Sequence, residues 1–312
     1  MTQTSGCIEM KSNLISIADL SSDEIRAILD RAEELKARRD DPATRSILAG
    51  KSLAAIFEKP STRTRVSLEV AMTDLGGHAL YLSKSDLQLG RGETIADTAR
   101  VLSRFVSGIA ARVYDHKTVE ELARAASVPV INSLSDREHP CQILADLMTM
   151  RERFGRLAGL KVAWVGDGNN VCNSTILASA LVGMEIVVAS PPGFGPDRKI
   201  LNQADRLGGG AVVVTDPVKA VSGADVVETD TWVSMGDESE AEKRLAAFGR
   251  YQVNSDLLKH ASDEAIVLHC LPAHRGREIT DEIMDGPRSA ILDQSENRLH
   301  SVKAVLEKMM VH

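Results

Sequence analysis

Short β-rich runs alternate with longer stretches of helical periodicity along most of this chain. Such alternation predicts an α/β fold, in which helices cover parallel strands and ligands bind beyond the carboxyl ends of those strands. Because 312 residues exceed the usual size of one domain, we expect two domains, each a doubly wound parallel sheet flanked by helices. The expected strands lie at residues 53–57, 108–113, 128–131, 162–165, 186–189, 211–214, 226–227 and 266–268.

A helix followed by glycines marks the expected boundary between the domains. The helical run from Pro140 to about Phe154 precedes Gly155, Gly159 and a new β-rich run at Val162. Glycine is typical of the position just after a helix. We therefore predict the boundary near residue 150. A further helix is expected at residues 241–248, after a short polar loop.

The charge balance and the absence of a long apolar run argue against two classes of partner. Lysine and arginine total 37 against 44 aspartates and glutamates, which gives a formal net charge of -7. The chain thus has no basic excess with which to neutralise a polynucleotide. It also has no apolar run near the ~18 residues of a membrane helix. Nucleic acid and membranes are therefore not expected partners.

The four cysteines indicate reduced thiols. Cys7, Cys141, Cys172 and Cys270 lie far apart and form no C-x-x-C pair, so we expect neither disulfides nor a structural zinc site. Residues 1–14 lack the continuous apolar core of a secretory signal. These features predict a cytoplasmic location.

The segment from Phe57 to Arg65 joins the end of a strand to the start of a helix. Ser61 is well placed to cap that helix, and free amides at a helix start bind anions. Ser61 and Thr62 alone would indicate only an ordinary cap. Arg63 and Arg65 oppose the helix dipole by roughly 0.3 to 1 kcal/mol each, which a bound anion would offset. We therefore predict a phosphate site here.

Two other clusters carry candidate chemistry. His139 and Gln142 flank Pro140 at the start of an amphipathic helix, near another set of free backbone amides. Cys270 follows a strand within Leu268-His-Cys-Leu-Pro272, where its thiol could be a nucleophile, a proton acceptor or a small buried apolar group.

A glycine-containing turn at Gly166-Asp-Gly-Asn-Asn-Val171 invites a dinucleotide interpretation. The dinucleotide pattern requires glycine at position 171, where Val171 stands. The next strand also ends in Ser190-Pro-Pro, without an acidic ribose ligand. We therefore reject NAD as a cofactor.

Seven segments in order resemble the aspartate and ornithine carbamoyltransferase family, from about residue 50 to the C-terminus. Ser234-Met-Gly236, at the end of the fifth segment, and the sixth segment, His269-Cys-Leu-Pro272, are similar to its ornithine branch; aspartate members usually carry His-Pro-Leu-Pro at the sixth. The segments are Ser61-Thr-Arg-Thr-Arg65, Leu87-Gln-Leu-Gly-Arg-Gly-Glu93, His139-Pro-Cys-Gln142, Gly166-Asp-Gly-Asn-Asn170, Asp230-Thr-Trp-Val-Ser-Met-Gly236, His269-Cys-Leu-Pro272 and Glu296-Asn-Arg298.

The resemblance implies transfer of a carbamoyl group from carbamoyl phosphate to the δ-amine of L-ornithine, which yields L-citrulline and phosphate. It implies a carbamoyl phosphate-binding domain at residues 1–150, on which a C-terminal helix at about 299–312 packs, and an ornithine-binding domain at 151–298. It also implies a homotrimer or a multiple of trimers. Neither a cofactor nor a metal is expected.

The resemblance also assigns residues to roles. Arg112, Thr64 and His139 would donate to the carbamoyl oxygen, while Gln142 and the Leu271 carbonyl would accept from the carbamoyl amide. The δ-amine must be uncharged to attack, and its pKa of ~10.4 makes the neutral form scarce; Cys270, coupled to Asp230, would accept its proton. The implied catalytic residues are Arg112, His139, Asp230 and Cys270. The implied carbamoyl phosphate ligands are Ser61, Thr62, Arg63, Thr64, Gln88, Arg112, His139, Gln142, Cys270, Leu271 and Arg298, and the implied ornithine ligands are Asn170, Asp230, Ser234 and Met235.

Several alternatives stay open at this point. The acceptor could be aspartate, putrescine or acetylornithine, or the chain could be a catalytically silent homologue. Both arginine synthesis and citrulline breakdown would use the same residues. Glu228 stands where family members are expected to carry an apolar residue or tyrosine, and it could perturb Asp230 if both faced the cleft.

Overall fold

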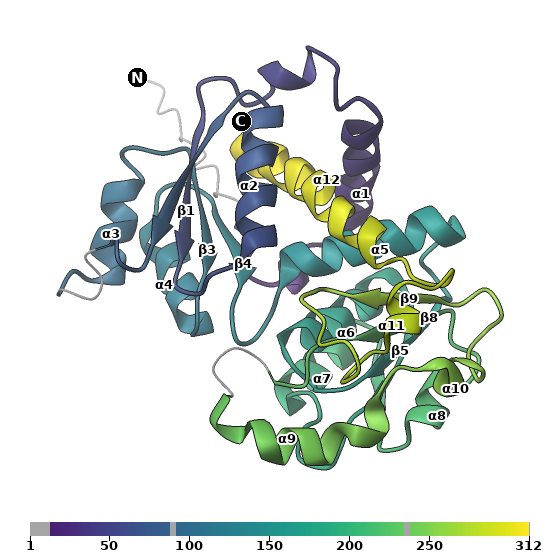
Figure 1. The fold of residues 1–312 in the computed structure, drawn as a ribbon. Coiled ribbons are helices and arrows are strands. Elements are labelled where there is room, and N and C mark those ends of the chain that lie inside the picture. Colours follow the sequence, from purple (N-terminus) through teal and green to yellow (C-terminus); the bar gives the residue numbers. More distant parts are fainter. Residues whose placement is uncertain (1–12, 88–91, 234–237, 312) are drawn as a thin grey trace.

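The computed structural model describes residues 13–87, 92–233 and 238–311 (Figure 1). Three residues with predicted roles, Gln88, Ser234 and Met235, lie outside the described residues. The fold is α/β, with two parallel sheets flanked by helices, as the sequence predicts.

The first sheet has the strand order β2-β1-β3-β4. All its pairings are parallel. The sequence argument missed the edge strand β2, although residues 79–82 form a short apolar run (Ala-Leu-Tyr-Leu); its side chains are all exposed or half-buried. The strands are β1 (Ser52–Phe57), β2 (His78–Ser83), β3 (Gly108–Arg112) and β4 (Val130–Leu134), and the helices are α1 (Ser22–Ala37), α2 (Thr62–Asp74), α3 (Ile95–Leu102), α4 (His116–Ala125) and α5 (Pro140–Phe154).

The second sheet has the order β7-β6-β5-β8-β9 and is also parallel throughout. The predicted helix at 241–248 is confirmed as α9. Its strands are β5 (Lys161–Val165), β6 (Glu185–Ala189), β7 (Ala211–Val214), β8 (Val226–Thr229) and β9 (Ile266–His269), and its helices are α6 (Asn170–Val182), α7 (Arg198–Arg206), α8 (Pro217–Val221), α9 (Ala241–Phe248), α10 (Ser255–Leu258) and α11 (Asp281–Met284).

The strand order creates a topological switch point in each sheet. The chain leaves β1 for β2 on one side and then reaches β3 on the other, and β5 is flanked in the same way by β6 and β8. Ligands of open α/β sheets bind at the carboxyl ends of the strands where the order reverses. The loops after β1, β3, β5 and β8 are therefore the expected site.

Two helices connect the halves of the molecule. Helix α12 (Ile291–Met310) begins earlier than the predicted residue 299 and packs against α1, α2 and α5 (Figure 1). Helix α5 was predicted to be amphipathic, but residues 140–150 are all buried, because α12, α1 and α6 all pack against this helix.

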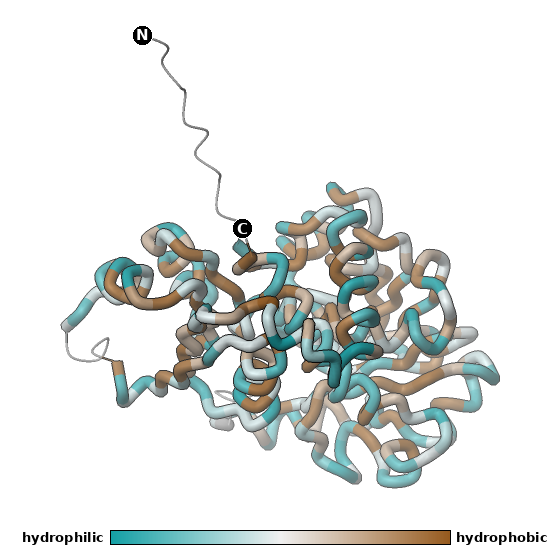
Figure 2. The backbone as a smooth tube through the Cα atoms, turned by 90° about the horizontal axis from the view of Figure 1, so that it is seen from above, coloured by the Kyte–Doolittle hydropathy of each residue, from teal (hydrophilic) through white to brown (hydrophobic). Residues whose placement is uncertain are grey.

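Other helices at the surface alternate between apolar and polar segments (Figure 2). Among the described residues, no helix has the length and apolar character of a membrane span.

Candidate active site

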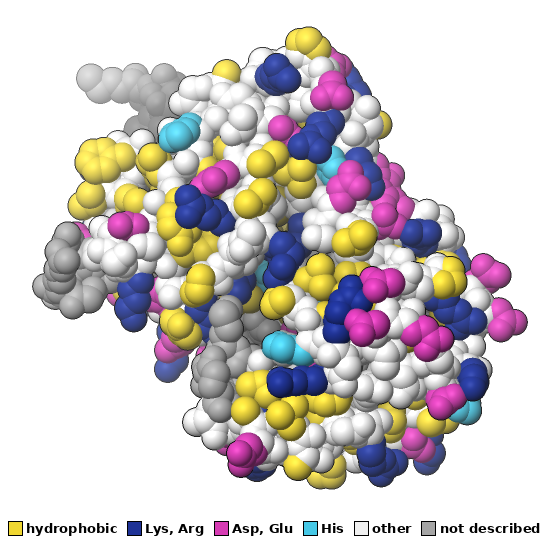
Figure 3. Space-filling model, in the orientation of Figure 1, with side chains coloured by type: hydrophobic (Ala, Val, Ile, Leu, Met, Phe, Trp, Pro, Cys, Tyr) yellow, Lys and Arg dark blue, Asp and Glu magenta, His cyan; other side chains and the backbone are white. Residues whose placement is uncertain are grey.

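A cavity of about 880 Å³ lies at the carboxyl ends of the strands, between the two sheets. Its volume falls within the range of small-molecule sites. Lysine and arginine side chains lie between the two lobes in the space-filling view (Figure 3). The predicted site residues that line the cavity are Ser61, Thr62, Arg63, Arg112, His139, Gln142, Asn170, Asp230, Cys270, Leu271 and Arg298.

The N-terminus of α2 forms one wall of the cavity. Ser61 caps the helix as predicted, since its Oγ accepts a hydrogen bond from the Thr64 amide at 3.3 Å. Arg63 lines the cavity. Arg65 does not: it pairs with Glu69 at 2.9 Å and stacks on the ring of Tyr81. The sequence argument that a bound anion would offset both cations is therefore wrong for Arg65, whose charge is offset by Glu69.

Three arginines from different elements meet in this wall. Arg63 belongs to α2, Arg112 ends β3, and Arg298 comes from α12. Arg298 donates to Gln142 Oε1 and to Thr64 Oγ1, both at 3.0 Å. Burial and the charge of Arg298 lower the pKa of Arg112 to about 10, with a smaller effect from Arg63. Nε of Arg112 and Nε of Arg298 are buried without a partner among the described residues. Positive charges that lie close together destabilise one another, and a bound anion would offset this repulsion.

His139 is held neutral beside these arginines. Its ring is buried, and burial together with the charges of Arg298 and Arg112 lowers its pKa well below the usual value. Its Nδ1 is buried without a partner among the described residues, while its backbone amide donates to Ser174 Oγ at 2.9 Å. A neutral imidazole can donate one hydrogen bond to a ligand without adding a charge.

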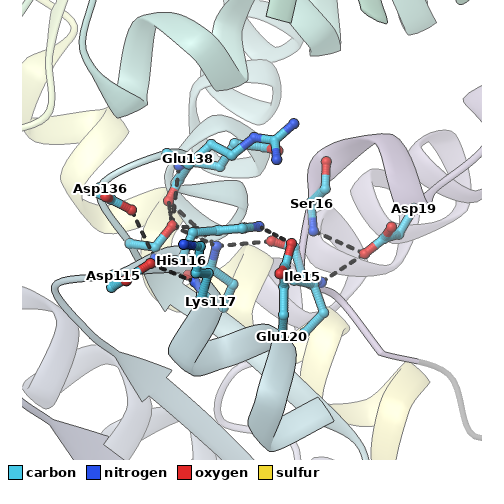
Figure 4. A network of polar contacts seen from close by, with 12 residues as sticks. Ile15, Ser16, Asp19, Asp115, His116, Lys117, Glu120, Asp136 and Glu138 are labelled. Carbon is cyan, nitrogen blue, oxygen red and sulfur yellow. Dashed lines mark hydrogen bonds and ion pairs between the residues drawn. The ribbon is translucent and has the colours of Figure 1, made fainter. Parts of the chain in front are cut away.

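The loop before His139 is anchored by the N-terminal segment and by α4 (Figure 4). Glu138 accepts a hydrogen bond from the Ile17 amide at 3.1 Å, and burial raises its pKa to about 7. Asp136 accepts from the His116 amide, and the His116 ring contacts Ser135 Oγ, both at 2.8 Å. These contacts fix the backbone that carries His139 before any ligand arrives.

The opposite wall offers a carboxylate. Asp230 follows β8, and its Oδ2 accepts from Asn169 Nδ2 at 2.7 Å. Its Oδ1 accepts from the Thr231 amide at 2.8 Å and from Cys270 Sγ at 3.0 Å. No described lysine or arginine forms an ion pair with it. A buried carboxylate of this kind fits an ammonium group of a ligand. Sequence reasoning missed Asn169, although its place directly after a strand and glycines could have indicated it.

Cys270 is a hydrogen-bond donor in this structure. Burial and the neighbouring Asp230 raise the pKa of its thiol well above the usual value. The thiol therefore does not ionise readily, contrary to the proton acceptor that we expected. The next residue, Leu271, has a φ of 60°, and its peptide bond to Pro272 is cis.

Asp230, His269 and Cys270 bring their donor atoms within 4.8 Å of one another. The sequence showed no such cluster, because these residues meet only where β8 pairs with β9. Each group already has a partner inside the fold. His269 Nδ1 accepts from the Leu271 amide at 2.9 Å, which leaves Nε2 to donate to Glu278 at 3.3 Å. These contacts account for the clustering without a metal ligand role.

The chain matches two family models that together span most of its length. The model for the carbamoyl-P binding domain of aspartate/ornithine carbamoyltransferase matches residues 12–152, and the model for the Asp/Orn binding domain matches residues 158–309. The chain belongs to the aspartate/ornithine carbamoyltransferase family. It is therefore an enzyme of a carbamoyltransferase family.

Curated carbamoyltransferases resemble the chain over nearly its whole length. The ornithine carbamoyltransferase of Methanoculleus marisnigri is 58% identical over 301 residues, which cover 96% of this chain and 97% of that protein. The solved structure of ornithine carbamoyltransferase from Pyrococcus furiosus has a TM-score of 0.92 at 55% identity and covers 96% of this chain and 97% of its own. The anabolic enzyme from Campylobacter jejuni has a TM-score of 0.90 at 41% identity, with coverage of 96% and 98%.

Proposed function

We propose that this carbamoyltransferase transfers the carbamoyl group of carbamoyl phosphate to the δ-amine of L-ornithine, giving L-citrulline and phosphate. The observation that carries the proposal is one cavity with three arginines on one wall and, on the other, the Asp230 carboxylate, which has no cationic partner among the described residues. The first wall suits the phosphate dianion of an acyl phosphate, and the second suits an amino acid with an ammonium group. Relatives named anabolic favour the direction of arginine biosynthesis.

Each substrate would bind one domain. Residues 1–150, with α12 packed on them, would hold the phosphate through the α2 amides, Ser61, Thr62, Thr64, Arg63 and Arg298, to which Gln88 would be added. Residues 151–298 would hold ornithine, with Asn170 and the Met235 amide on the α-carboxylate and Asp230 with Ser234 on the α-ammonium. The cytoplasmic location stays a prediction from the sequence.

The carbamoyl group would lie between the two walls. Attack by the δ-amine makes a tetrahedral species whose oxygen gains negative charge, and fixed donors aimed at that oxygen are commonly the largest catalytic contribution. Arg112, Thr64 and His139 would be those donors. His139 suits the role because it lines the cavity and is neutral. Gln142 and the Leu271 carbonyl would accept from the carbamoyl amide. As the C–N bond forms and the C–O bond to phosphate breaks, the phosphate would leave bound to arginine and would take up the proton that the attacking nitrogen releases.

The decisive experiment measures citrulline formation from carbamoyl phosphate and ornithine by the purified protein. Parallel assays replace ornithine with aspartate, putrescine or acetylornithine. We expect ornithine to give the highest kcat/KM. A higher kcat/KM with another acceptor would identify that compound as the preferred substrate. No turnover with any of the four acceptors would indicate a catalytically silent homologue.

The dependence of the rate on pH should have two limbs. Activity should rise from pH 6 to about 9, because the δ-amine, with a pKa of ~10.4, must lose its proton. Since the pKa of Arg112 is lowered to about 10, its charge is lost as the pH rises through that value. The kcat/KM for carbamoyl phosphate should therefore fall above about pH 10. A profile of kcat/KM that is flat both from pH 6 to 9 and above pH 10 would contradict the roles given to the δ-amine and to Arg112.

Substitutions at Cys270 separate two roles of the thiol. If Cys270 serves by donating to Asp230, Cys270→Ser should keep the KM for ornithine within about threefold, while Cys270→Ala should raise it roughly tenfold because Asp230 Oδ1 loses a donor. Steady-state kinetics with varied ornithine measures both. If instead both variants slowed kcat equally, with KM unchanged, Cys270 would be the proton acceptor after all.

A homotrimer, or a multiple of trimers, with shared sites is part of the proposal. Gln88 would reach the phosphate of a neighbouring subunit, so Gln88→Ala would donate a defective loop and Arg63→Ala would carry a defective pocket. Mixed trimers can pair a sound pocket with a sound loop. Refolding the two inactive variants together should therefore restore part of the activity. Hybrids verified by native mass spectrometry that stay inactive would rule out the shared site.

A further inference from the structure

Glu228 is a buried carboxyl that the reaction does not use. It lies on β8, only 1% exposed, and does not line the cavity, so it does not face the cleft with Asp230 as the sequence allowed. Its Oε2 accepts from Thr175 Oγ1 at 3.3 Å. Its Oε1 has no partner atom among the hydrogen bonds of the described residues. Its side chain interacts directly with that of Asp146.

Asp146, on α5, has the complementary arrangement. It is fully buried, and its Oδ1 accepts from Gln142 Nε2 at 2.8 Å and from Gln294 Nε2 at 2.6 Å. Its Oδ2, like Glu228 Oε1, is buried without a donor in the described part of the chain. Two ionised carboxyls in contact would repel and leave both oxygens unsatisfied. One proton between them removes both problems, because a protonated carboxyl is a donor.

We propose that Glu228 and Asp146 share one proton, which Glu228 donates to Asp146, and that this acid pair orients the Gln142 side chain in the active site. Glu228 is thus a positioning residue. The role in the reaction rests on the proposed function, whereas the shared proton does not.

The electrostatics of the pair agree with this arrangement. Burial, and then the charge of Asp146, raise the pKa of Glu228 well above its usual value, and burial raises the pKa of Asp146 to a smaller extent. Glu228 is therefore the weaker acid and keeps the proton. Asp230 also acts on Glu228, and Arg298 acts on Asp146. The two carboxyls in turn act on nearby thiols: Glu228, together with Asp167, acts on Cys172, and Asp146, together with Asp230 and Arg298, acts on Cys270.

The pair determines which end of the Gln142 amide faces the cavity. Because Asp146 can only accept from Gln142, the amide nitrogen turns toward it and Oε1 turns toward Arg298, at 3.0 Å from Nη1. The reversed amide would place its NH₂ against the Arg298 guanidinium, two donors facing each other. The orientation seen here presents an acceptor in the cavity, as the carbamoyl amide would require.

The shared proton also has a consequence for stability. A carboxyl whose folded pKa is raised stabilises the fold fully below its unfolded pKa, and this contribution is lost as the pH rises through the folded value. At neutral pH the folded pair holds a proton that the unfolded chain does not. Unfolding should therefore release it.

Two substitutions at Glu228 test the pair. Glu228→Gln keeps a donor toward Asp146 and an acceptor for Thr175, so kcat/KM for carbamoyl phosphate should stay within about twofold. Glu228→Val removes the donor, and kcat/KM should fall roughly tenfold. Infrared spectra at neutral pH should show the C=O band of a protonated buried carboxyl in the wild type, and both substitutions should remove it. Because the pKa of Glu138 is also raised, to about 7, Glu138→Gln serves as the control that removes a different carboxyl band.

The outcomes are separable. If the wild type makes citrulline and both Glu228 variants match it, Glu228 does not position Gln142. If Glu228→Gln leaves the carboxyl band and the proton release on unfolding unchanged, there is no shared proton, and this test holds even if Glu228→Val fails to fold. A wild type without carbamoyltransferase activity would overturn the proposed function and leave the spectroscopic result to decide on the proton.

Discussion

Arg63→Ala should lower kcat/KM for carbamoyl phosphate by about a hundredfold or more while the protein stays folded. Arg63 lines the cavity at the first turn of α2 and has no described ion-pair partner, so its substitution would remove the proposed charge-assisted contact to phosphate and little else. Its loss also relieves repulsion on Arg112 and Arg298, whose pKa values it helps to lower. The Tm of the ligand-free variant should therefore be equal to that of the wild type or higher.

Arg65→Ala is the matched control, because this arginine stands on the same turn but pairs with Glu69 outside the cavity. It should keep kcat/KM within about twofold, since an exposed ion pair contributes ~1 kcal/mol at most to stability and nothing to the site. Inorganic phosphate should raise the Tm of the wild type and of Arg65→Ala but not that of Arg63→Ala. Near wild-type kinetics for Arg63→Ala would refute the phosphate site at α2.

Local sequence patterns predicted local structure well. Ser61 was expected to cap a helix and does, and α5 and α9 have the expected bounds. The Ser61 cap on α2, and Pro140 and Gly155 at the two ends of α5, act within a few residues of where they stand. The edge strand β2 was missed, although it contains the short apolar run Ala79-Leu-Tyr-Leu82. The fate of Arg65 also escaped, since its direction is set by Glu69 and by Tyr81 on β2.

Contacts between distant segments could not be read in this way. Arg298 reaches Thr64 across 234 positions of the chain, and Gln294 reaches Asp146 across 148. The resemblance to a family placed Arg298 in the site, but nothing in the sequence indicated that Glu228 would meet Asp146. The raised pKa of the Cys270 thiol likewise depends on burial and on Asp230, forty positions away, at 3.0 Å. The proton positions at Glu228, Asp146 and Cys270 therefore could be inferred only from the structure.

Asp230→Asn should raise the KM for ornithine by roughly 150-fold to 5,000-fold, with a much smaller effect on KM for carbamoyl phosphate. Asp230 is 7% exposed and has no described cationic partner, so in our proposal the ligand ammonium is its counter-ion. Removing one member of a buried ion pair costs about 3 to 5 kcal/mol, because the other charge is left uncompensated. The substitution is nearly isosteric, so shape is preserved and charge is what changes.

The control for Asp230→Asn is Asp216→Asn, a substitution at the cap of α8 that is remote from the cavity lining. It should leave both KM values unchanged and lower the Tm slightly, since an amide oxygen still caps a helix. Calorimetry on Asp230→Asn should show carbamoyl phosphate binding close to the wild-type affinity, while ornithine binding to the complex is lost. If both substrates weakened equally, Asp230 would be supporting the cavity as a whole rather than recognising the ammonium group.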